Sequence, residues 1–153
     1  MQAIIYARQS SGNEDHSLSI EQQISNCKEL CKERGLTIKD IFSDYNSSGR
    51  TYPSGSEKVA VNDITFNKWF SNQNSKKKFR NGLGDVFSQL DRGDVIVVDD
   101  LTRLYRSIGY SMLENHIKQL LSEKNARVIV CKGINLDVDN FADNLITTMQ
   151  NQI

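Results

Sequence analysis

The sequence predicts an α/β fold in which helices flank a mostly parallel central sheet. Segments with strand character alternate with segments of helical periodicity, which is typical of repeated strand–helix–strand units. Residues 95–98 (Val-Ile-Val-Val) are apolar at every position, as expected of a strand covered on both faces. The chain has 153 residues, 38% hydrophobic and 25% charged, which suits one globular domain with a substantial core.

Three elements are predicted in the first 44 residues. Residues 2–8 form an apolar strand. Ser19 begins a capping-box pattern, with a glutamine three residues later, so a helix is expected to run from there to Arg34, where Gly35 ends it. Residues 36–44 form a second strand, which completes a strand–helix–strand unit.

A long polar stretch, residues 45–79, separates the two halves of the chain and is far longer than an ordinary connection. Within it, residues 63–70 could form a short helix that buries aromatic side chains. The elements predicted after it are a helix at 81–90, the strand at 95–98, a helix at 107–123, a strand at 126–131 and a helix at 139–153.

The last predicted helix carries an apolar stripe at Phe141, Leu145 and Met149. Two interpretations stay open. The stripe packs on the sheet of its own domain, or it belongs to a helix that meets a partner subunit and continues in a longer protein.

Composition and charge exclude several classes of protein. No apolar run is long enough to span a bilayer, and the N-terminus lacks the basic and apolar segments of a signal peptide. The formal net charge is zero, which argues against binding nucleic acid by bulk electrostatics but leaves room for a local basic site.

The three cysteines are expected to be small core residues. Cys27 and Cys31 fall on the apolar stripe of the first helix, and Cys131 falls in a buried strand. Free thiols of this kind indicate a reduced, cytoplasmic compartment. The sequence places no further metal-ligating residues at suitable spacing from His16 or His116, so no metal site is expected.

A serine and three arginines are the candidate site residues. Ser10 follows the first strand, two residues after Arg8, and the two side chains would project together because alternate residues of an extended chain point the same way. Arg103 and Arg106 follow the strand at 95–98, and their spacing puts them on one face of a helical turn. Since open α/β sheets bind ligands at the carboxyl ends of their strands, these side chains are expected to converge there.

This set of residues suits phosphoryl transfer to a serine. A hydroxyl is a poor nucleophile, and the transition state spreads negative charge over the phosphate oxygens, so catalysis depends on positioning and charge stabilisation. Arginine suits the task because its planar fork binds two oxygens and keeps its charge. Two alternatives stay open: Ser11 is a competing nucleophile, and Arg103 and Arg106 could be ordinary surface residues at a helix start.

Several motifs resemble those of the catalytic domain of serine site-specific recombinases, the resolvase/invertase group with its large integrase and transposase relatives. Residues 6–11 (Tyr-Ala-Arg-Gln-Ser-Ser) resemble the nucleophile motif, and residues 19–23 (Ser-Ile-Glu-Gln-Gln) resemble the motif that opens the next helix. Residues 42–49 are similar to the family's strand and polar loop, and residues 80–106 to the arginine-bearing segment. The resemblance covers nearly the whole chain except about residues 51–79.

The resemblance implies an enzyme that cuts and rejoins DNA at specific sites. Ser10 would attack the scissile phosphate, giving a 5′-phosphoserine link and a free 3′ hydroxyl, with no metal, nucleotide or other cofactor. The phosphate would be bound by Arg8, Arg103 and Arg106. The supporting residues would be Gln23, Ser48, Arg80 and Thr102. The implied partners are double-stranded DNA and further copies of the chain, as a homodimer or homotetramer.

The sequence departs from the family pattern in places. The residue before Arg103 is usually aspartate in small resolvases and is Thr102 here. Asp99 and Asp100 lie close by but on different faces, so the group that orients Arg103 stays open. A lysine that some members use corresponds to Gln89.

We expect residues 1–153 to form one recombinase catalytic domain, in which residues 51–79 are an insertion outside the chemistry and residues 139–153 begin a truncated oligomerisation helix. The family's C-terminal DNA-binding domain is missing from the sequence, so an isolated catalytic fragment is expected. Two other functions stay open: a non-catalytic oligomerisation or regulatory module with the same fold, and a small-molecule phosphatase.

Overall fold

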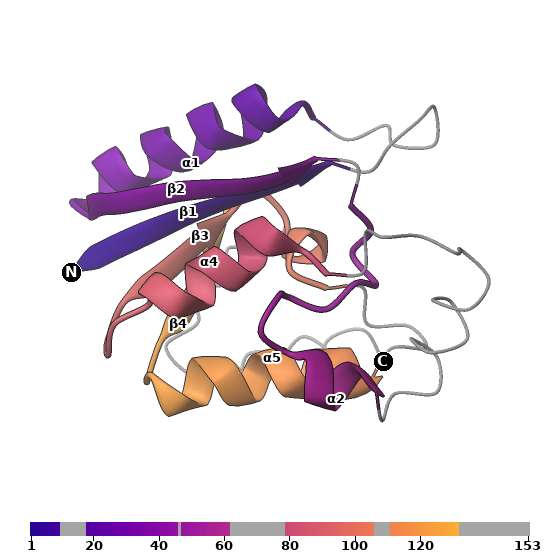
Figure 1. The fold of residues 1–153 in the computed structure, drawn as a ribbon. Helices are drawn as coiled ribbons and strands as arrows, with labels where there is room; N and C mark the ends of the chain where they lie inside the picture. The colour runs from indigo at the N-terminus through magenta and orange to yellow at the C-terminus, as the bar shows by residue number, and fades with distance from the viewer. Residues whose placement is uncertain (10–17, 46, 62–78, 106–110, 132–153) are drawn as a thin grey trace, which may run out of the picture.

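The computed structural model describes residues 1–9, 18–45, 47–61, 79–105 and 111–131 (Figure 1). Helix α1 (Ile20–Arg34) covers one face of a central sheet, while α4 (Asn81–Gln89) and α5 (Ser111–Glu123) lie on the other. The short α2 (Glu57–Val61) lies beside α5. The predicted α/β class with flanking helices is confirmed.

The described sheet has four strands, all parallel, in the order β2-β1-β3-β4. They are β1 (Gln2–Gln9), β2 (Thr37–Tyr45), β3 (Val95–Val98) and β4 (Arg127–Val130), and each bound lies within one residue of its prediction. Pairing of β1 with β2 continues to Gln9 opposite Tyr45, whereas pairing with β3 ends at Tyr6 opposite Val98. The last three residues of β1 therefore extend beyond β3 at the carboxyl edge of the sheet.

Alternate residues of β1 fill two separate cores, as the pleat of a strand requires. Ala3 and Ile5 face α1 and belong to a core with Cys27 and Cys31, against which the half-buried Cys131 packs. All three cysteines are free, and their predicted role as small core residues is confirmed. The opposite core contains Ile4 and Tyr6 of β1, Leu83 and Val86 of α4, and Leu113 and Ile117 of α5.

Helix α1 begins and ends where the capping residues in the sequence predict. The hydroxyl of Ser19 accepts a hydrogen bond from the backbone N–H of Gln22 at 3.1 Å and so caps the first turn. Gly35 ends the helix with a φ of 67°, and its N–H donates to carbonyl oxygens of the last turn. Because a left-handed conformation costs other residues about 1–2 kcal/mol, glycine suits this position.

The predicted insertion, residues 51–79, is described from residue 51 to 61 and at Phe79. Tyr52 and Ala60 are fully buried in the core that includes α4 and α5. The first part of the stretch therefore packs with the rest of the domain, and an insertion in the remainder stays a prediction. The helices predicted at 63–70 and 139–153 lie outside the described residues.

The start of α4 lies close against β2. A Cβ atom at Gly82 would lie 2.3 Å from the carbonyl oxygen of Ser43 and 3.0 Å from Oδ2 of Asp44. The absence of a side chain at this position allows the backbone of α4 to reach Asp44, to which the N–H of Gly82 donates at 2.8 Å. This approach brings the residue before α4, Arg80, to the carboxyl edge of the sheet.

We predict that Gly82→Ala destabilises the domain, although alanine is favoured over glycine inside a helix by about 1 kcal/mol. The overlap is with backbone atoms, so α4 must move away from β2, at a cost of about 1–3 kcal/mol. Urea unfolding measures the change. Gln89→Ala, at the exposed end of the same helix, is the control and should change stability by less than about 0.5 kcal/mol. A Gly82→Ala variant as stable as the unmodified protein would contradict the prediction.

Candidate active site

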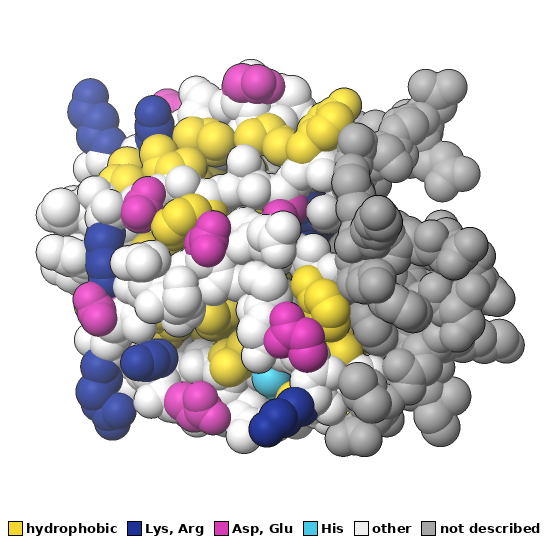
Figure 2. All heavy atoms as spheres, in the orientation of Figure 1, with side chains coloured by type: hydrophobic (Ala, Val, Ile, Leu, Met, Phe, Trp, Pro, Cys, Tyr) yellow, Lys and Arg dark blue, Asp and Glu magenta, His cyan; other side chains and the backbone are white. Residues whose placement is uncertain are grey.

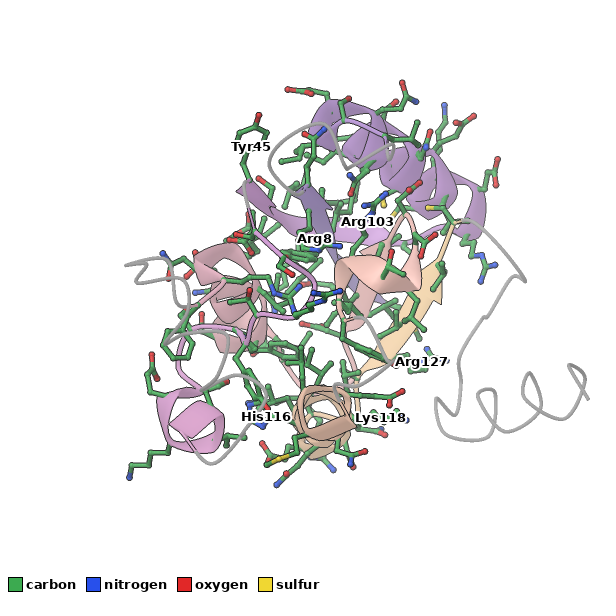
Figure 3. All side chains as sticks on the ribbon, turned by 90° about the vertical axis from the view of Figure 1, so that its right-hand side faces the viewer. Arg8, Tyr45, Arg103, His116, Lys118 and Arg127 are labelled. Carbon is green, nitrogen blue, oxygen red and sulfur yellow. The ribbon has the colours of Figure 1, made fainter. Side chains whose placement is uncertain are left out.

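Five segments meet at the carboxyl edge of the sheet, where β1 extends beyond β3. They are the end of β1, the first turn of α1, the loop after β2, the residue before α4, and η1 (Leu101–Arg103), a single 3₁₀ turn that follows β3. Figure 3 shows Arg8 and Arg103 beside each other at this edge, whereas His116 and Lys118 lie apart from them on α5. The edge is where the sequence analysis expected a site.

At the end of β1, the side-chain amide of Gln23, on α1, makes the hydrogen bonds that a neighbouring strand would otherwise make. Its Oε1 accepts from the backbone N–H of Arg8 at 3.1 Å, and its Nε2 donates to the carbonyl oxygen of Arg8 at 2.9 Å and to that of Leu18 at 2.8 Å. Because β3 no longer pairs with β1 here, the buried amide satisfies both backbone groups of Arg8. Gln23 therefore fixes the backbone two residues before Ser10.

The guanidinium of Arg8 is buried, and the residue is only 1% exposed. Its Nη1 donates to the carbonyl oxygen of Ser47 at 2.8 Å and its Nη2 to that of Thr102 at 2.9 Å. Its Nε donates to the carbonyl oxygen of Arg103 at 3.3 Å. Arg8 therefore ties the end of β1 to the loop after β2 and to η1.

Arg80, directly before α4, is fully buried and reaches the same turn. Its Nε donates to the carbonyl oxygen of Thr51 at 2.7 Å, its Nη1 to that of Arg103 at 2.7 Å, and its Nη2 to that of Leu104. The carbonyl end of a helical turn carries partial negative charge, which favours cations. Arg8 and Arg80 both use this attraction to hold η1.

Arg103 is itself almost completely buried. Its Nη1 donates to the carbonyl oxygen of Arg8 at 3.4 Å, and its Nη2 lies 3.6 Å from Oδ2 of Asp99. Its Nε has no hydrogen-bond partner among the residues that the structure describes. Asp99 is fully buried and accepts from Nδ2 of Asn26 at 3.3 Å through its other oxygen. The carboxylate that contacts Arg103, which the sequence left open, is therefore Asp99.

Asp100 has a different role, because it caps η1. Its Oδ1 accepts from the backbone N–H of Thr102 at 2.9 Å and from the Thr102 hydroxyl at 3.0 Å. The side chain of Thr102 is therefore paired with Asp100 and not with Arg103. Thr102 contacts the arginine cluster through its carbonyl oxygen, which accepts from Arg8.

Asp44 joins β1, β2 and the start of α4. Its Oδ2 accepts from the Tyr6 hydroxyl at 2.7 Å and from the N–H of Leu83 at 2.9 Å, in a position at a helix N-terminus that favours a negative charge. Burial raises the pKa of Tyr6 well above its usual range, although the nearby Arg80 acts in the opposite direction. Tyr6 therefore stays protonated and donates to Asp44.

Ser48 lies in the turn after β2 and is half-buried. Its hydroxyl accepts from the N–H of Arg50 at 3.1 Å, and its carbonyl oxygen accepts from the N–H of Thr51 at 3.2 Å. The neighbouring carbonyl oxygens of Ser47 and Thr51 receive Arg8 and Arg80. The turn at Ser48 thus positions the carbonyl oxygens that accept hydrogen bonds from Arg8 and Arg80.

The structure places most of the predicted site residues together. Those that it brings to one cluster are Arg8, Gln23, Arg80, Thr102 and Arg103, with Ser48 in the adjoining turn. Ser10, Ser11 and Arg106 lie outside the described residues. Sequence reasoning missed Asn26, whose only signal was its position one helical turn after Gln23, on the same side of α1.

The arrangement is suited to an oxyanion. Three guanidinium groups lie in one buried cluster, with Asp99 as the carboxylate in ion-pair contact with Arg103. In surroundings of low polarity their positive charges act strongly on an incoming anion. A phosphate group fits the planar fork of an arginine. Over the described part of the face in Figure 2, acidic and basic side chains are interspersed.

The described residues contain neither a metal-binding cluster nor a membrane-spanning helix. Among them, no group of three or more His, Cys, Asp or Glu side chains is arranged to hold a metal ion. None of the helices in the same part of the chain is long and apolar enough to cross a bilayer.

Comparisons with known proteins give one family match and two structures of the same fold. A family model described as the resolvase N-terminal domain matches residues 3–59 and 55–153. The N-terminal catalytic domain of TP901-1 integrase superposes with a TM-score of 0.56 at 18% identity, over 99% of this chain and 95% of that one. The C-terminal catalytic domain of ISC1926 TnpA, an IS607-like serine recombinase, gives 0.55 at 20% identity, over 97% and 78%. These two structures share the fold, and no curated protein sequence matches the chain.

We predict that Gln23→Leu destabilises the domain strongly, because the buried N–H of Arg8 loses its acceptor and the carbonyl oxygens of Arg8 and Leu18 lose a donor. Each buried unsatisfied group costs about 1–3 kcal/mol. Chemical unfolding followed by circular dichroism measures the loss. Gln22→Leu makes the same change at the exposed neighbouring position and is the control, with an expected change below about 0.5 kcal/mol. Equal losses in the two variants would mean that Gln23 does not support β1.

Proposed function

Because the chain belongs to the resolvase N-terminal domain family, we propose that it cleaves and rejoins DNA through a covalent intermediate on Ser10. Membership makes it the catalytic domain of a serine site-specific recombinase, the enzyme class that the sequence predicted. The assignment of the nucleophile rests on one observation, the cluster of Arg8, Arg80 and Arg103 at the end of β1. Ser10 follows this strand directly after Gln9, its last residue.

The proposed reaction exchanges one phosphate ester for another. The Ser10 oxygen attacks the scissile phosphorus and loses its proton, the bond from phosphorus to the 3′ oxygen breaks, and that oxygen leaves as a hydroxyl. The product is a 5′-phosphoserine link. Since the ester bond is kept, the reverse attack by a 3′ hydroxyl rejoins a strand without ATP. The proposed mechanism uses no metal ion and no nucleotide cofactor.

The arginines would supply the charge stabilisation that this reaction needs. Negative charge develops on the phosphate oxygens in the transition state, and fixed donors aimed at them lower the barrier. The family resemblance assigned phosphate contact to Arg8, Arg103 and Arg106. Since Nε, Nη1 and Nη2 of Arg8 all donate to backbone carbonyl oxygens, we now assign direct phosphate contact to Arg103 and Arg106 and a supporting positive charge to Arg8. The contacts of the cluster support a positioning role for Gln23, Ser48, Arg80 and Thr102.

The partners follow from the family at a coarse level, since serine recombinases act on DNA as oligomers. We propose that this chain works as a homodimer that pairs into a homotetramer, with four Ser10 nucleophiles to cut both strands of two duplexes. We also propose a cytoplasmic location, which the three free thiols support. The family match favours the recombinase over the two alternatives, a regulatory module and a small-molecule phosphatase.

We predict that Ser10→Ala abolishes covalent attachment to DNA while folding persists. The test uses the protein as the cell makes it, incubated with supercoiled plasmids that carry the DNA on both sides of its gene, and detects protein–DNA adducts on denaturing gels. Ser11→Ala is the matched control and should still form the adduct. Peptide mapping then locates the attached residue. An adduct on Ser11, or none with the unmodified protein, would contradict the proposal.

We predict that Arg103→Lys and Arg106→Lys each slow adduct formation by about 10²–10³, the usual loss for one transition-state donor. An ammonium group keeps the charge but cannot bind two oxygens in one plane. Single-turnover rates of adduct formation measure the effect, and Arg92→Lys, at an exposed arginine, is the control. Normal rates for both variants would mean that neither arginine contacts the phosphate, and the buried Arg103 would then have a structural role only.

A further inference from the structure

Asp99 is a buried carboxylate in the middle of an otherwise cationic cluster. It follows β3 directly and is fully buried. Removing an ionised carboxylate from water is unfavourable unless it is paired and hydrogen-bonded. Oδ1 accepts from Nδ2 of Asn26 at 3.3 Å. Oδ2 has no hydrogen-bond partner among the described residues and is paired only by charge, 3.6 Å from Nη2 of Arg103.

Helix α1 holds Asp99 from the side opposite to Arg103. The Oδ1 atom of Asn26 accepts from Nε2 of Gln22 at 3.1 Å, which leaves its Nδ2 to face Asp99. A polar chain thus runs from the exposed surface of α1 through Asn26 and Asp99 to Arg103. The same helix carries Gln23, which fixes the backbone of Arg8. One rigid element therefore positions both the strand before Ser10 and the partner of Arg103.

The side chain of Arg103 has few other constraints among the described residues. Its backbone is fixed, because its carbonyl oxygen receives Arg8 and Arg80. Its guanidinium is held by a long hydrogen bond to the carbonyl oxygen of Arg8, at 3.4 Å, and by Asp99. Its Nε is buried and has no hydrogen-bond partner in the described part of the chain. The direction of this guanidinium therefore depends on Asp99.

We propose that Asp99, held by Asn26, is a positioning residue that directs the guanidinium of Arg103 toward the scissile phosphate. The proposal rests on the proposed function, in which Arg103 contacts that phosphate. Thr102, the residue before Arg103, does not take this part, because its hydroxyl is paired with Asp100. The 3.6 Å separation is longer than a hydrogen bond, so Asp99 attracts Arg103 without occupying its donors fully. Arg103 can then turn its donors to a phosphate at little cost.

The test is a double-mutant cycle in the protein as the cell makes it. Asp99→Asn keeps the size of the side chain and removes its charge, and it should slow adduct formation by about 10- to 100-fold, since misplacement of a catalytic group by about 1 Å has an effect of this size. In the Arg103→Ala background the same substitution should slow the reaction less than about twofold, because Asp99 acts only through Arg103. Asp85→Asn, at an exposed position on α4, removes one negative charge elsewhere and should react normally.

Two further measurements separate positioning from folding. The side-chain NMR signals of Arg103 in ¹⁵N-labelled protein should shift in Asp99→Asn and, less strongly, in Asn26→Ala. Asn26→Ala keeps the buried charge pair but removes the hydrogen bond to Oδ1 of Asp99, so this variant should be less stable and show a loss of rate in the same direction. Thermal unfolding of each variant shows whether the rates refer to folded protein.

The outcomes distinguish this inference from the proposed function. If Arg103→Ala slows the reaction and Asp99→Asn does not, only the role of Asp99 is wrong. If Asp99→Asn causes an equal loss with and without Arg103, Asp99 acts on the fold and the inference is overturned. If the Arg103→Ala variant reacts at the normal rate, Arg103 does not contact the phosphate, and the proposed function is wrong in that assignment. The NMR shifts then still show whether Asp99 orients Arg103.

Discussion

The carbonyl oxygen of Arg103 accepts hydrogen bonds from Nε of Arg8 at 3.3 Å and from Nη1 of Arg80 at 2.7 Å, and the geometry of the site depends on this shared acceptor. Burying two guanidinium groups is unfavourable unless their donors are satisfied. Further carbonyl oxygens, in the loop after β2 and in η1, satisfy them. Consequently β1, that loop, the start of α4 and η1 cannot move independently at the edge of the sheet.

This constraint explains why the functional residues can lie on short irregular segments. A 3₁₀ turn of three residues has little stability of its own, and a loop beside it would ordinarily be mobile. Here the turn is capped by Asp100 at one end and bound by Arg8 and Arg80 at the other. The backbone of Arg103 is thus held at both ends of the turn, which favours catalysis by preorganised donors.

Much of the fold could be predicted from the sequence, because strand hydrophobicity and the signals at Ser19 and Gly35 are local. The meeting of Arg8 and Arg103 was predictable from their positions at the ends of two parallel strands. Arg80, which precedes a helix, was assigned only through the family resemblance. The acceptors of the arginines were not predictable, since backbone carbonyl oxygens leave no trace in side-chain patterns. The choice between Asp99 and Asp100 depended on backbone geometry: Asp100 is extended, with φ of −147° and ψ of 146°, before η1 turns Arg103 back toward Asp99. No pattern of residue types specifies that turn.

The contacts of the three arginines indicate which of them is available to bind an anion. Arg8 and Arg80 bind the negative end of a turn, so their positive charges serve the fold whether or not a ligand is present. Arg103 differs, because its carboxylate partner lies beyond hydrogen-bonding distance and its Nε has no hydrogen-bond partner among the described atoms. A purely structural arginine would gain stability from a closer ion pair. The looser contact leaves donor capacity for an anion beside the strand that leads to Ser10, and the positive charges of the neighbouring Arg8 and Arg80 add to the attraction.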